Sequence, residues 1–376
     1  MATHLLRRDQ FQQFLDLLWA SGFRCVGPRV RDGAIVFDEL AAVADLPAAV
    51  VDDQAPGRYR LRETGSPRWF EWATGPQAIK PLTFAPRETL WRAQRDADGA
   101  ITFTTPDRQA ERVAVIGVRG CDLAALALQD RHFLEGVHPD PAYRARREAL
   151  FIVAVHCARS AATCFCVSTG DGPAALQGYD LVLGELDDCF TLAAGSDAGT
   201  ALLDRLAAAL DLPGCDAAHE ASVRAQVEQA AESQERALPG RDLRPGLAAN
   251  LDHPQWDDIA TRCLACGNCT SVCPTCFCHR EADVPELAGA ASDHQREWDS
   301  CFSGDHGYIA GWNIRQQPRY RYQQWLTHKL GAWHDQYGRS GCVGCGRCIA
   351  WCPTGIDITA EAALLGAAPA PEADNG

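Results

Sequence analysis

The chain has 376 residues, of which 47% are hydrophobic, 22% charged and 8% aromatic. This length and composition suit one large or two modest globular domains, and they exclude a disordered chain, a collagen and a coiled coil. With 35 Lys and Arg against 49 Asp and Glu, the formal net charge is −14. A nucleic-acid-binding surface gathers many Lys and Arg on one face, so this balance argues against that class of function.

The apolar runs and the cysteines indicate the compartment. No apolar run approaches the roughly 18 residues of a membrane helix, and the first residues lack the pattern of a signal peptide. We therefore expect a soluble, cytoplasmic protein without a membrane span. In that compartment its 18 cysteines, which stand beside a single Met, stay reduced. This favours metal binding over disulfides.

The first 250 residues predict a mixed α/β arrangement. Apolar residues at helical spacing predict a helix over about residues 8–20, and short apolar runs at 34–37 and 101–105 predict strands. The continuous runs RVAVIGVRG from 112 and ALFIVAVHC from 149 predict buried strands, and CDLAALALQD after the first run predicts a helix. Residues 197–237 predict two helices separated by a turn at Pro213 and Gly214. Buried strands that alternate with helices are typical of an α/β layer with some parallel pairing.

An internal repeat is the strongest chemical signal. The spacing C-x2-C-x2-C-x3-C-P occurs at residues 263–274 and again at 342–353. Three closely spaced cysteines can wrap one loop around three irons of a cubane 4Fe-4S cluster, while the fourth iron needs a cysteine from elsewhere. In a doubled motif, each fourth cysteine serves the other cluster. The predicted ligands are Cys263, Cys266, Cys269 and Cys352 for cluster 1, and Cys342, Cys345, Cys348 and Cys273 for cluster 2.

The repeat and a boundary rich in Pro and Gly, near residues 237–256, predict the domain organisation. The predicted fold class is α+β or α/β. We expect an N-terminal α/β domain over 1–250, with a candidate iron-sulfur site of its own. A ferredoxin-like domain with two 4Fe-4S clusters follows over 251–362 and contains a long helical insert at 274–341. A disordered tail is expected over 363–376.

Zinc is the alternative to iron for this cysteine spacing. A zinc ribbon uses two C-x2-C pairs for one ion, so zinc leaves four of the eight thiolates without a role. The insert adds Cys276, Cys278 and Cys301, three thiols without an evident fourth ligand. It is also locally basic, with five Arg or Lys against two Asp between residues 304 and 340. This charge indicates docking of an acidic partner, charge compensation of the clusters, or a solvated helix face.

A second and weaker set of thiols lies in the N-terminal region. It comprises Cys121, Cys157, Cys164 and Cys166. Cys121 opens a predicted helix, whose dipole favours a thiolate, and the other three follow the next predicted strand. Because loops at the ends of neighbouring strands converge, these thiols predict a candidate third cluster, with Asp122 as a candidate oxygen ligand. The alternative is that these cysteines are buried only as packing residues and bind no metal.

The sequence shows no motif for a catalytic or nucleotide-binding site. Neither a G-x-G-x-x-G after a strand nor a Walker A sequence occurs, and no G-x-S-x-G marks a nucleophile. We therefore predict no catalytic residue and no cofactor-binding residue beyond the cluster ligands.

Taken together, the motifs resemble a known family. The sequence is similar to the iron-sulfur beta subunits of cytosolic sulfhydrogenases, which are NAD(P)-linked nickel-iron hydrogenases, and to the iron-sulfur subunit of anaerobic sulfite reductase. The matching stretches are GVRGCDLAAL at 117–126, CFCVSTGDGP at 164–173, RCLACGNCTSVCPTCFC at 262–278, REWDSCF at 296–302, RYRYQQWLTHKL at 319–330 and GCVGCGRCIAWCPTGIDI at 341–358. The combination is more specific than the ferredoxin motif alone.

The resemblance implies an electron-transfer subunit of an oxidoreductase complex. In such complexes a flavin-containing partner exchanges hydride with NAD(P)H, and this type of subunit passes single electrons through its clusters. A catalytic partner, which is a nickel-iron hydrogenase and sulfur reductase or a sulfite reductase, then consumes the electrons. Two alternatives stay open at this point: a self-contained iron-sulfur reductase of a sulfur compound, and a zinc-stabilised interaction scaffold.

Overall fold

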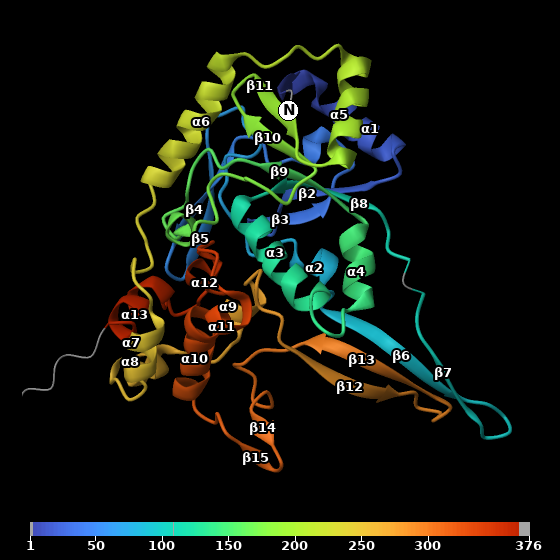
Figure 1. Cartoon of the computed structure of the whole chain (residues 1–376), viewed down its shortest axis with the longest axis vertical. Coiled ribbons are helices and arrows are strands. Elements are labelled where there is room, and N and C mark those ends of the chain that lie inside the picture. Colours follow the sequence, from blue (N-terminus) through green and yellow to red (C-terminus); the bar gives the residue numbers. More distant parts are fainter. Residues whose placement is uncertain (1–2, 108, 368–376) are drawn as a thin grey trace, which may run out of the picture.

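A mixed sheet of seven strands forms the centre of the N-terminal region (Figure 1). The computed structural model describes residues 3–107 and 109–367. The strands are β1 (Thr3–Arg7), β2 (Arg24–Arg31), β3 (Ala34–Glu39), β8 (Val113–Val118), β9 (Leu150–Val155), β10 (Leu181–Glu185) and β11 (Cys189–Ala194). They follow the order β1-β11-β10-β9-β8-β2-β3, and β2, β8, β9 and β10 pair in parallel. The predicted mixed α/β fold with some parallel pairing is therefore confirmed.

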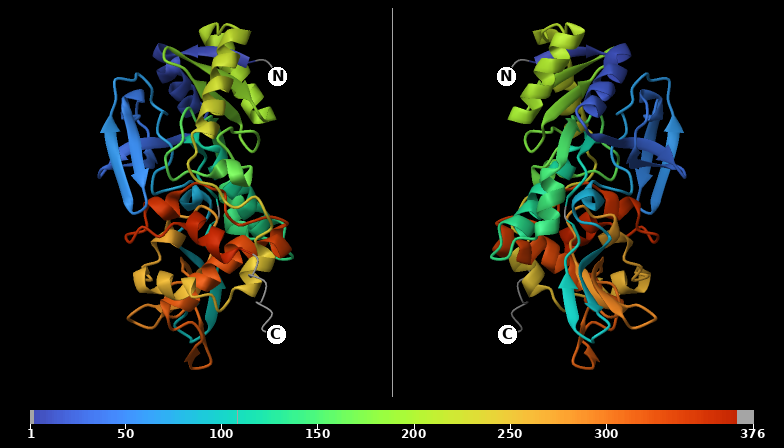
Figure 2. Two further views of the ribbon diagram at one scale, coloured as in Figure 1. Left: turned by 90° about the vertical axis from the view of Figure 1, so that its left-hand side faces the viewer. Right: turned by 90° about the vertical axis from the view of Figure 1, so that its right-hand side faces the viewer.

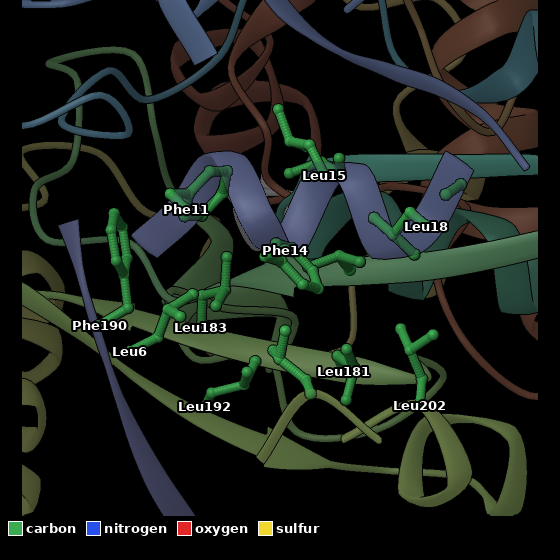
Figure 3. Close-up of a cluster of buried hydrophobic side chains, with 14 of the residues drawn as sticks. Leu6, Phe11, Phe14, Leu15, Leu18, Leu181, Leu183, Phe190, Leu192 and Leu202 are labelled. Carbon is green, nitrogen blue, oxygen red and sulfur yellow. The ribbon is translucent and has the colours of Figure 1, made fainter. Parts of the chain in front are cut away.

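Helices cover both faces of this sheet. Successive side chains of a strand point to opposite faces, so Ala114 and Ile116 join one core cluster while Val113 and Val115 join another. On the first face, α1 (Phe11–Ala20) and α5 (Asp197–Leu210) bury their apolar sides against the strands, as Figure 3 shows. On the opposite face lies α3 (Gly120–Leu134). Each fully buried Leu or Phe contributes roughly 1.5–3 kcal/mol.

A second sheet combines segments that lie far apart in the sequence. It has the order β12-β13-β6-β7, with β12 (His279–Pro285), β13 (Ala291–Trp298), β6 (Arg87–Arg95) and β7 (Ile101–Thr104). In Figure 1 this long ribbon extends away from the rest of the molecule. Strands from both predicted domains thus share one sheet. The insert predicted to be helical begins with a β-hairpin, and its helical part follows as α10 (Pro318–Thr327), the π-helix η4 (His328–Ala332) and α11 (Trp333–Tyr337).

Short helices surround the two cysteine motifs. They are α7 (Arg244–Ala249), α8 (Gln255–Arg262), α9 (Asn268–Ser271), α12 (Arg347–Ala350) and α13 (Ile358–Leu365). Together with α10 they enclose a core that includes Trp256 and Leu326. The views in Figure 2 show these red and yellow helices below the green strands β10 and β11, and the orange and cyan hairpins lie further down. Since α13 ends at Leu365, helix continues into the predicted tail, and residues 368–376 lie outside the described part.

The remaining strands and α-helices lie outside the large sheet, the second sheet and the cysteine-motif core. They are the hairpin β4 (Val50–Ala55) and β5 (Arg58–Glu63), α2 (Lys80–Thr83), α4 (Pro141–Glu148), α6 (Ala217–Glu232), and the small hairpin β14 (Tyr308–Ile309) and β15 (Trp312–Asn313). The two helices predicted around Pro213 and Gly214 are present as α5 and α6. Among the described residues, no helix has the length and apolar character needed to cross a membrane.

Candidate iron-sulfur centres

The first cysteine motif wraps around a hollow. After α8 ends, the loop turns sharply because Ala265 and Gly267 adopt left-handed backbone angles, with φ of 50° and 76°. The hollow has an empty volume of about 450 Å³, which includes its opening to solvent. Its lining includes Cys263, Cys266 and Cys269 of this loop, Cys348 and Cys352 of the other motif, and the mostly apolar side chains of Phe302, Tyr322, Trp325, Ile356 and Ile358. The structure thus brings together the four thiols predicted for cluster 1.

The chemistry of this lining fits a 4Fe-4S cluster. The backbone N–H of Ala265 lies 3.4 Å from Cys263 Sγ, and that of Ile356 lies 3.3 Å from Cys352 Sγ. Such N–H donors offset the negative charge of a thiolate-ligated cluster. Within residues 3–107 and 109–367, no three His, Cys, Asp or Glu side chains are placed to hold a single metal ion. The thiols surround a space instead of meeting at one point.

The second motif places its thiols deeper in the protein. Its loop bends at Gly344 and Gly346, whose φ angles are 64° and 73°. Burial raises the pKa of Cys348, and the neighbouring thiols of Cys342, Cys345 and Cys273 raise it further. The four thiols predicted for cluster 2 therefore lie within range of one another's charge. Because Cys348 also lines the hollow at the first motif, the two sets are direct neighbours.

A buried lysine faces the second set. Lys329 lies in η4 and is only 4% exposed. Its Nζ is 3.4 Å from Cys273 Sγ and donates a hydrogen bond of 2.9 Å to Thr275 Oγ1. Burial lowers the pKa of Lys329, but the thiols of Cys273, Cys276 and Cys342 outweigh it and raise the pKa well above its usual value. The ammonium therefore compensates negative charge on these sulfurs.

Three other basic residues of the insert have partners within the chain. Arg319 pairs with Asp257 at 2.8 Å, and Arg339 pairs with the buried carboxylate of Asp171. Arg321 donates to three backbone carbonyls. Since these side chains have partners within the chain, the basic character of the insert fits charge compensation and internal packing better than docking of an acidic partner.

The N-terminal thiols also come together. Burial raises the pKa of Cys166, with a further contribution from the thiol of Cys157, and both thiols act in the same way on Cys164. Burial likewise raises the pKa of Cys121 well above its usual value, with smaller contributions from neighbours that include Cys345 and Cys166. The four predicted thiols therefore share one buried region beside the second motif.

Tight backbone contacts attach this region to the second motif. The N–H of Phe165 donates a hydrogen bond of 2.8 Å to the carbonyl of Gly344. A Cβ atom at Gly344 would lie 2.5 Å from the backbone of Cys166, and one at Gly346 would lie 2.3 Å from the carbonyl oxygen of Thr163. Only glycine allows this approach, so the loop at 163–166 and the second motif form one packed unit.

Asp122, expected as a candidate oxygen ligand, instead forms a buried ion pair. Its two carboxylate oxygens accept hydrogen bonds of 2.7 and 3.0 Å from the guanidinium of Arg347, and both side chains are fully buried. Arg347 also donates to the carbonyl of Gly75 at 3.0 Å. The carboxylate is therefore committed to an ion pair that joins α3 to α12, which lies inside the second motif.

Sequence reasoning missed a buried lysine near the first motif, whose burial lowers its pKa. Lys80 on α2 is 5% exposed, and its Nζ lies 3.2 Å from the carbonyl of Cys276 and 3.5 Å from that of Ser271. The lysine precedes the first motif by more than 180 residues, so no local pattern in the sequence connects the two. Only the tertiary fold brings this amine to the cysteines.

Comparison with known proteins agrees with the cysteine geometry. A family model described as a 4Fe-4S dicluster domain matches residues 262–356, which span both motifs and the insert. The chain is also 32% identical over 285 residues to the sulfhydrogenase 2 subunit beta of Pyrococcus furiosus. That alignment covers 74% of this chain and 79% of the relative.

Proposed function

Because the chain belongs to the family of sulfhydrogenase beta subunits, which the sequence motifs correctly predicted, we propose a specific relay function for it. It is an iron-sulfur electron-transfer protein. In the proposed complex it takes single electrons from a flavin-containing, NAD(P)H-linked partner and delivers them to a nickel-iron hydrogenase partner. The name of the Pyrococcus furiosus relative, a subunit beta, supports the assignment to a complex of several subunits.

The observation that carries this proposal is the crossed placement of the motif thiols. Cys263, Cys266 and Cys269 share their hollow with Cys352 from the other motif, and Cys273 lies among the thiols of the second motif. This arrangement supports two clusters, each held by three cysteines of one motif and the last cysteine of the other. The ligand sets predicted from the sequence are the sets we propose.

The protein's own residues would hold and tune these clusters. A bound 4Fe-4S cluster supplies reversible one-electron chemistry. Backbone N–H groups of Ala265 and Ile356 donate to ligand sulfurs, which favours the more negative, reduced form. Tyr322 and Trp325 are 4% exposed and close the apolar side of the hollow, so they keep water from cluster 1.

We propose a third cluster on Cys121, Cys157, Cys164 and Cys166. Their gathering in one buried region supports it, because four neighbouring thiols outside any disulfide can supply the four ligands of a cubane cluster. The N-terminal region over 1–250 would then be an electron-transfer domain in its own right, joined to the ferredoxin-like domain over 251–362 by the loop contacts at Gly344.

The metal content of anaerobically purified protein tests the proposal. We expect about eight irons and eight sulfides per chain from the double motif, and about twelve of each with the N-terminal cluster. EPR should show reduced clusters after dithionite. Zinc without iron would overturn the proposal in favour of an interaction scaffold. Turnover of sulfite or polysulfide by the isolated chain with an artificial donor would overturn it in favour of a self-contained reductase.

A further inference from the structure

Two buried hydrogen-bond donors beside the first cysteine motif have no acceptor in the described part of the chain. Among residues 3–107 and 109–367, eight buried side-chain nitrogen or oxygen atoms lack a hydrogen-bond partner. Two of these atoms, Tyr322 Oη and Trp325 Nε1, belong to side chains that line the hollow of the first motif. The other six belong to residues outside that lining. The wall that faces the motif thiols therefore carries two donors of its own.

The helix α10 holds both side chains on this wall. They lie three positions apart, which places them on one face of the helix, and their ring centroids are 5.2 Å apart. The ring of Phe302, 6.2 Å from each of them, completes the aromatic wall. Because the three rings pack against one another in a buried core, the two donors cannot turn to bulk water without opening that core.

Unpaired donors are costly in such a position. Buried polar side-chain atoms almost always have a hydrogen-bond partner, and a buried Tyr or Trp usually directs its O–H or N–H to one. Trp256, in the same core, follows this rule, since its Nε1 donates a hydrogen bond of 2.7 Å to the carbonyl of Asn250. Tyr322 and Trp325 depart from it at the one place where thiols from both motifs line a hollow.

Sulfur is the acceptor that the donor set of this hollow implies. A cluster held by the motif cysteines presents thiolate and sulfide sulfurs to the wall, and hydrogen bonds to these sulfurs are a known means of setting a cluster's potential. Burial raises the pKa of Tyr322 well above its usual value, and the nearby groups of Glu361, Cys348, Cys269 and Cys352 raise it further. The phenol therefore keeps its proton, and an indole N–H can only donate.

We propose that Tyr322 and Trp325 donate hydrogen bonds to sulfurs of cluster 1 and thereby raise its reduction potential. The proposal rests on the proposed electron-transfer function and names two side chains that set the potential of one step in it. Reduction adds negative charge to the sulfurs, and a hydrogen bond strengthens as its acceptor becomes more negative. The two donors therefore favour the reduced form of cluster 1, in addition to shielding it from water.

The variants Tyr322→Phe and Trp325→Phe of the full-length chain test the proposal. Each keeps an aromatic ring and removes one donor. In an EPR-monitored redox titration, we expect the ratio of reduced to oxidised cluster 1 at a fixed potential to fall about threefold to tenfold in each variant, where tenfold corresponds to about 59 mV. The Fe–S stretching bands in resonance Raman spectra should shift as well. Iron content should stay unchanged, because neither side chain is a ligand.

Two control variants remove the same chemical groups where they have partners within the chain. Tyr143→Phe removes a buried hydroxyl that donates to Asp130 at 2.7 Å, and Trp256→Phe removes the indole N–H paired with Asn250. Neither residue lines the hollow. Both controls should leave the potential of cluster 1 and its Fe–S bands in place, even where they lower the stability of the fold.

The outcomes separate this proposal from the relay function. Unchanged potential and Fe–S bands in both donor variants, at full iron content, would overturn the proposal and assign the two donors to ordered water. An equal shift in Trp256→Phe would also overturn it, because the shift would then follow from packing. If Trp325→Phe does not fold, Tyr322→Phe decides alone, since it removes a single oxygen. Absence of any reducible cluster in the unaltered protein would instead refute the relay function itself.

Discussion

Replacing Lys329 by Met tests whether this buried charge tunes cluster 2. Reduction adds an electron, so a nearby cation stabilises the reduced form and raises the midpoint potential. Met preserves the length and the apolar part of the side chain but removes the ammonium next to Cys273. We therefore expect the midpoint potential of cluster 2 to become more negative.

The structure sets a minimum size for this shift. Lys329 Nζ lies 3.4 Å from Cys273 Sγ. At an effective dielectric constant of about 20, two unit charges at that separation interact by about 5 kcal/mol. If the added electron spreads evenly over the cluster's four ligand sulfurs, about a quarter of this energy, roughly 1.2 kcal/mol, involves Cys273. For a one-electron step, where about 59 mV corresponds to a tenfold change, the potential should fall by roughly 50 mV or more.

An EPR-monitored redox titration measures the shift in protein with confirmed iron content. Lys329→Arg keeps the charge and should restore most of the potential. Arg319→Met removes a cation that is paired with Asp257 instead of a thiol, and it should leave the potential of cluster 2 in place. An unchanged or more positive potential in Lys329→Met, at full iron loading, would refute the electrostatic role assigned to this lysine.

Three further predictions concern the packing and the ligand sets. Asp122→Ala leaves Arg347 buried without its counter-charge and should lower the free energy of unfolding by about 3–5 kcal/mol, as urea denaturation would show; a change below about 1 kcal/mol would contradict a structural ion pair. Gly344 has a φ of 64° and no room for a Cβ, so Gly344→Ala should lower the free energy of unfolding by about 1–3 kcal/mol or more and weaken the attachment of the N-terminal thiol loop. Gly33 has a φ of 75° but lies in open space, so the control Gly33→Ala should lower it only by the cost of the strained backbone. Cys266→Ser should remove the EPR signal of cluster 1 and spare cluster 2, and equal loss of both in folded protein would argue against the crossed ligand sets.

Local patterns were sufficient to predict most of the N-terminal fold. The strands β8 and β9 consist of continuous β-branched and apolar residues, which have few alternatives to burial between two layers of helices. The turn at Pro213 and Gly214 separates α5 from α6 because proline removes a helical donor and glycine favours a turn. In these segments the local preference and the tertiary packing agree.

The β12–β13 hairpin shows where local patterns fail. The strand β12 has the sequence HREADVP, which combines charged residues with a terminal proline and has little strand preference of its own. It forms because β13 pairs with β6, a strand from the N-terminal region, which supplies backbone partners that no nearby residue offers. The same long-range pairing explains why a domain boundary placed from composition does not separate two independent sheets.

Within the candidate site, only the gathering of the motif thiols was predictable from the sequence, and their role as cluster ligands stays a prediction. Cysteine spacing encodes which thiols a loop can bring to one cluster, so both motif sets followed from the sequence. The charges around them did not follow, because charge compensation depends on distance in the folded protein and not on spacing. Lys80 comes from a four-residue helix far from the motifs, and Asp122, which looked free to bind metal, is held by Arg347 from the second motif.

On the proposed ligand sets, the thiols form a continuous series through the protein. Cys166 of the N-terminal set is near Cys345 of cluster 2, and Cys348 of cluster 2 is near Cys269 of cluster 1. Cys166 is 6% exposed, whereas Cys266 is exposed and follows Leu264, which is 66% exposed. A relay needs short internal steps together with at least one end that a partner can approach. The buried N-terminal set would serve an internal step, and the exposed loop of cluster 1 would serve as the accessible end. We therefore propose cluster 1 as the point at which electrons enter or leave this chain.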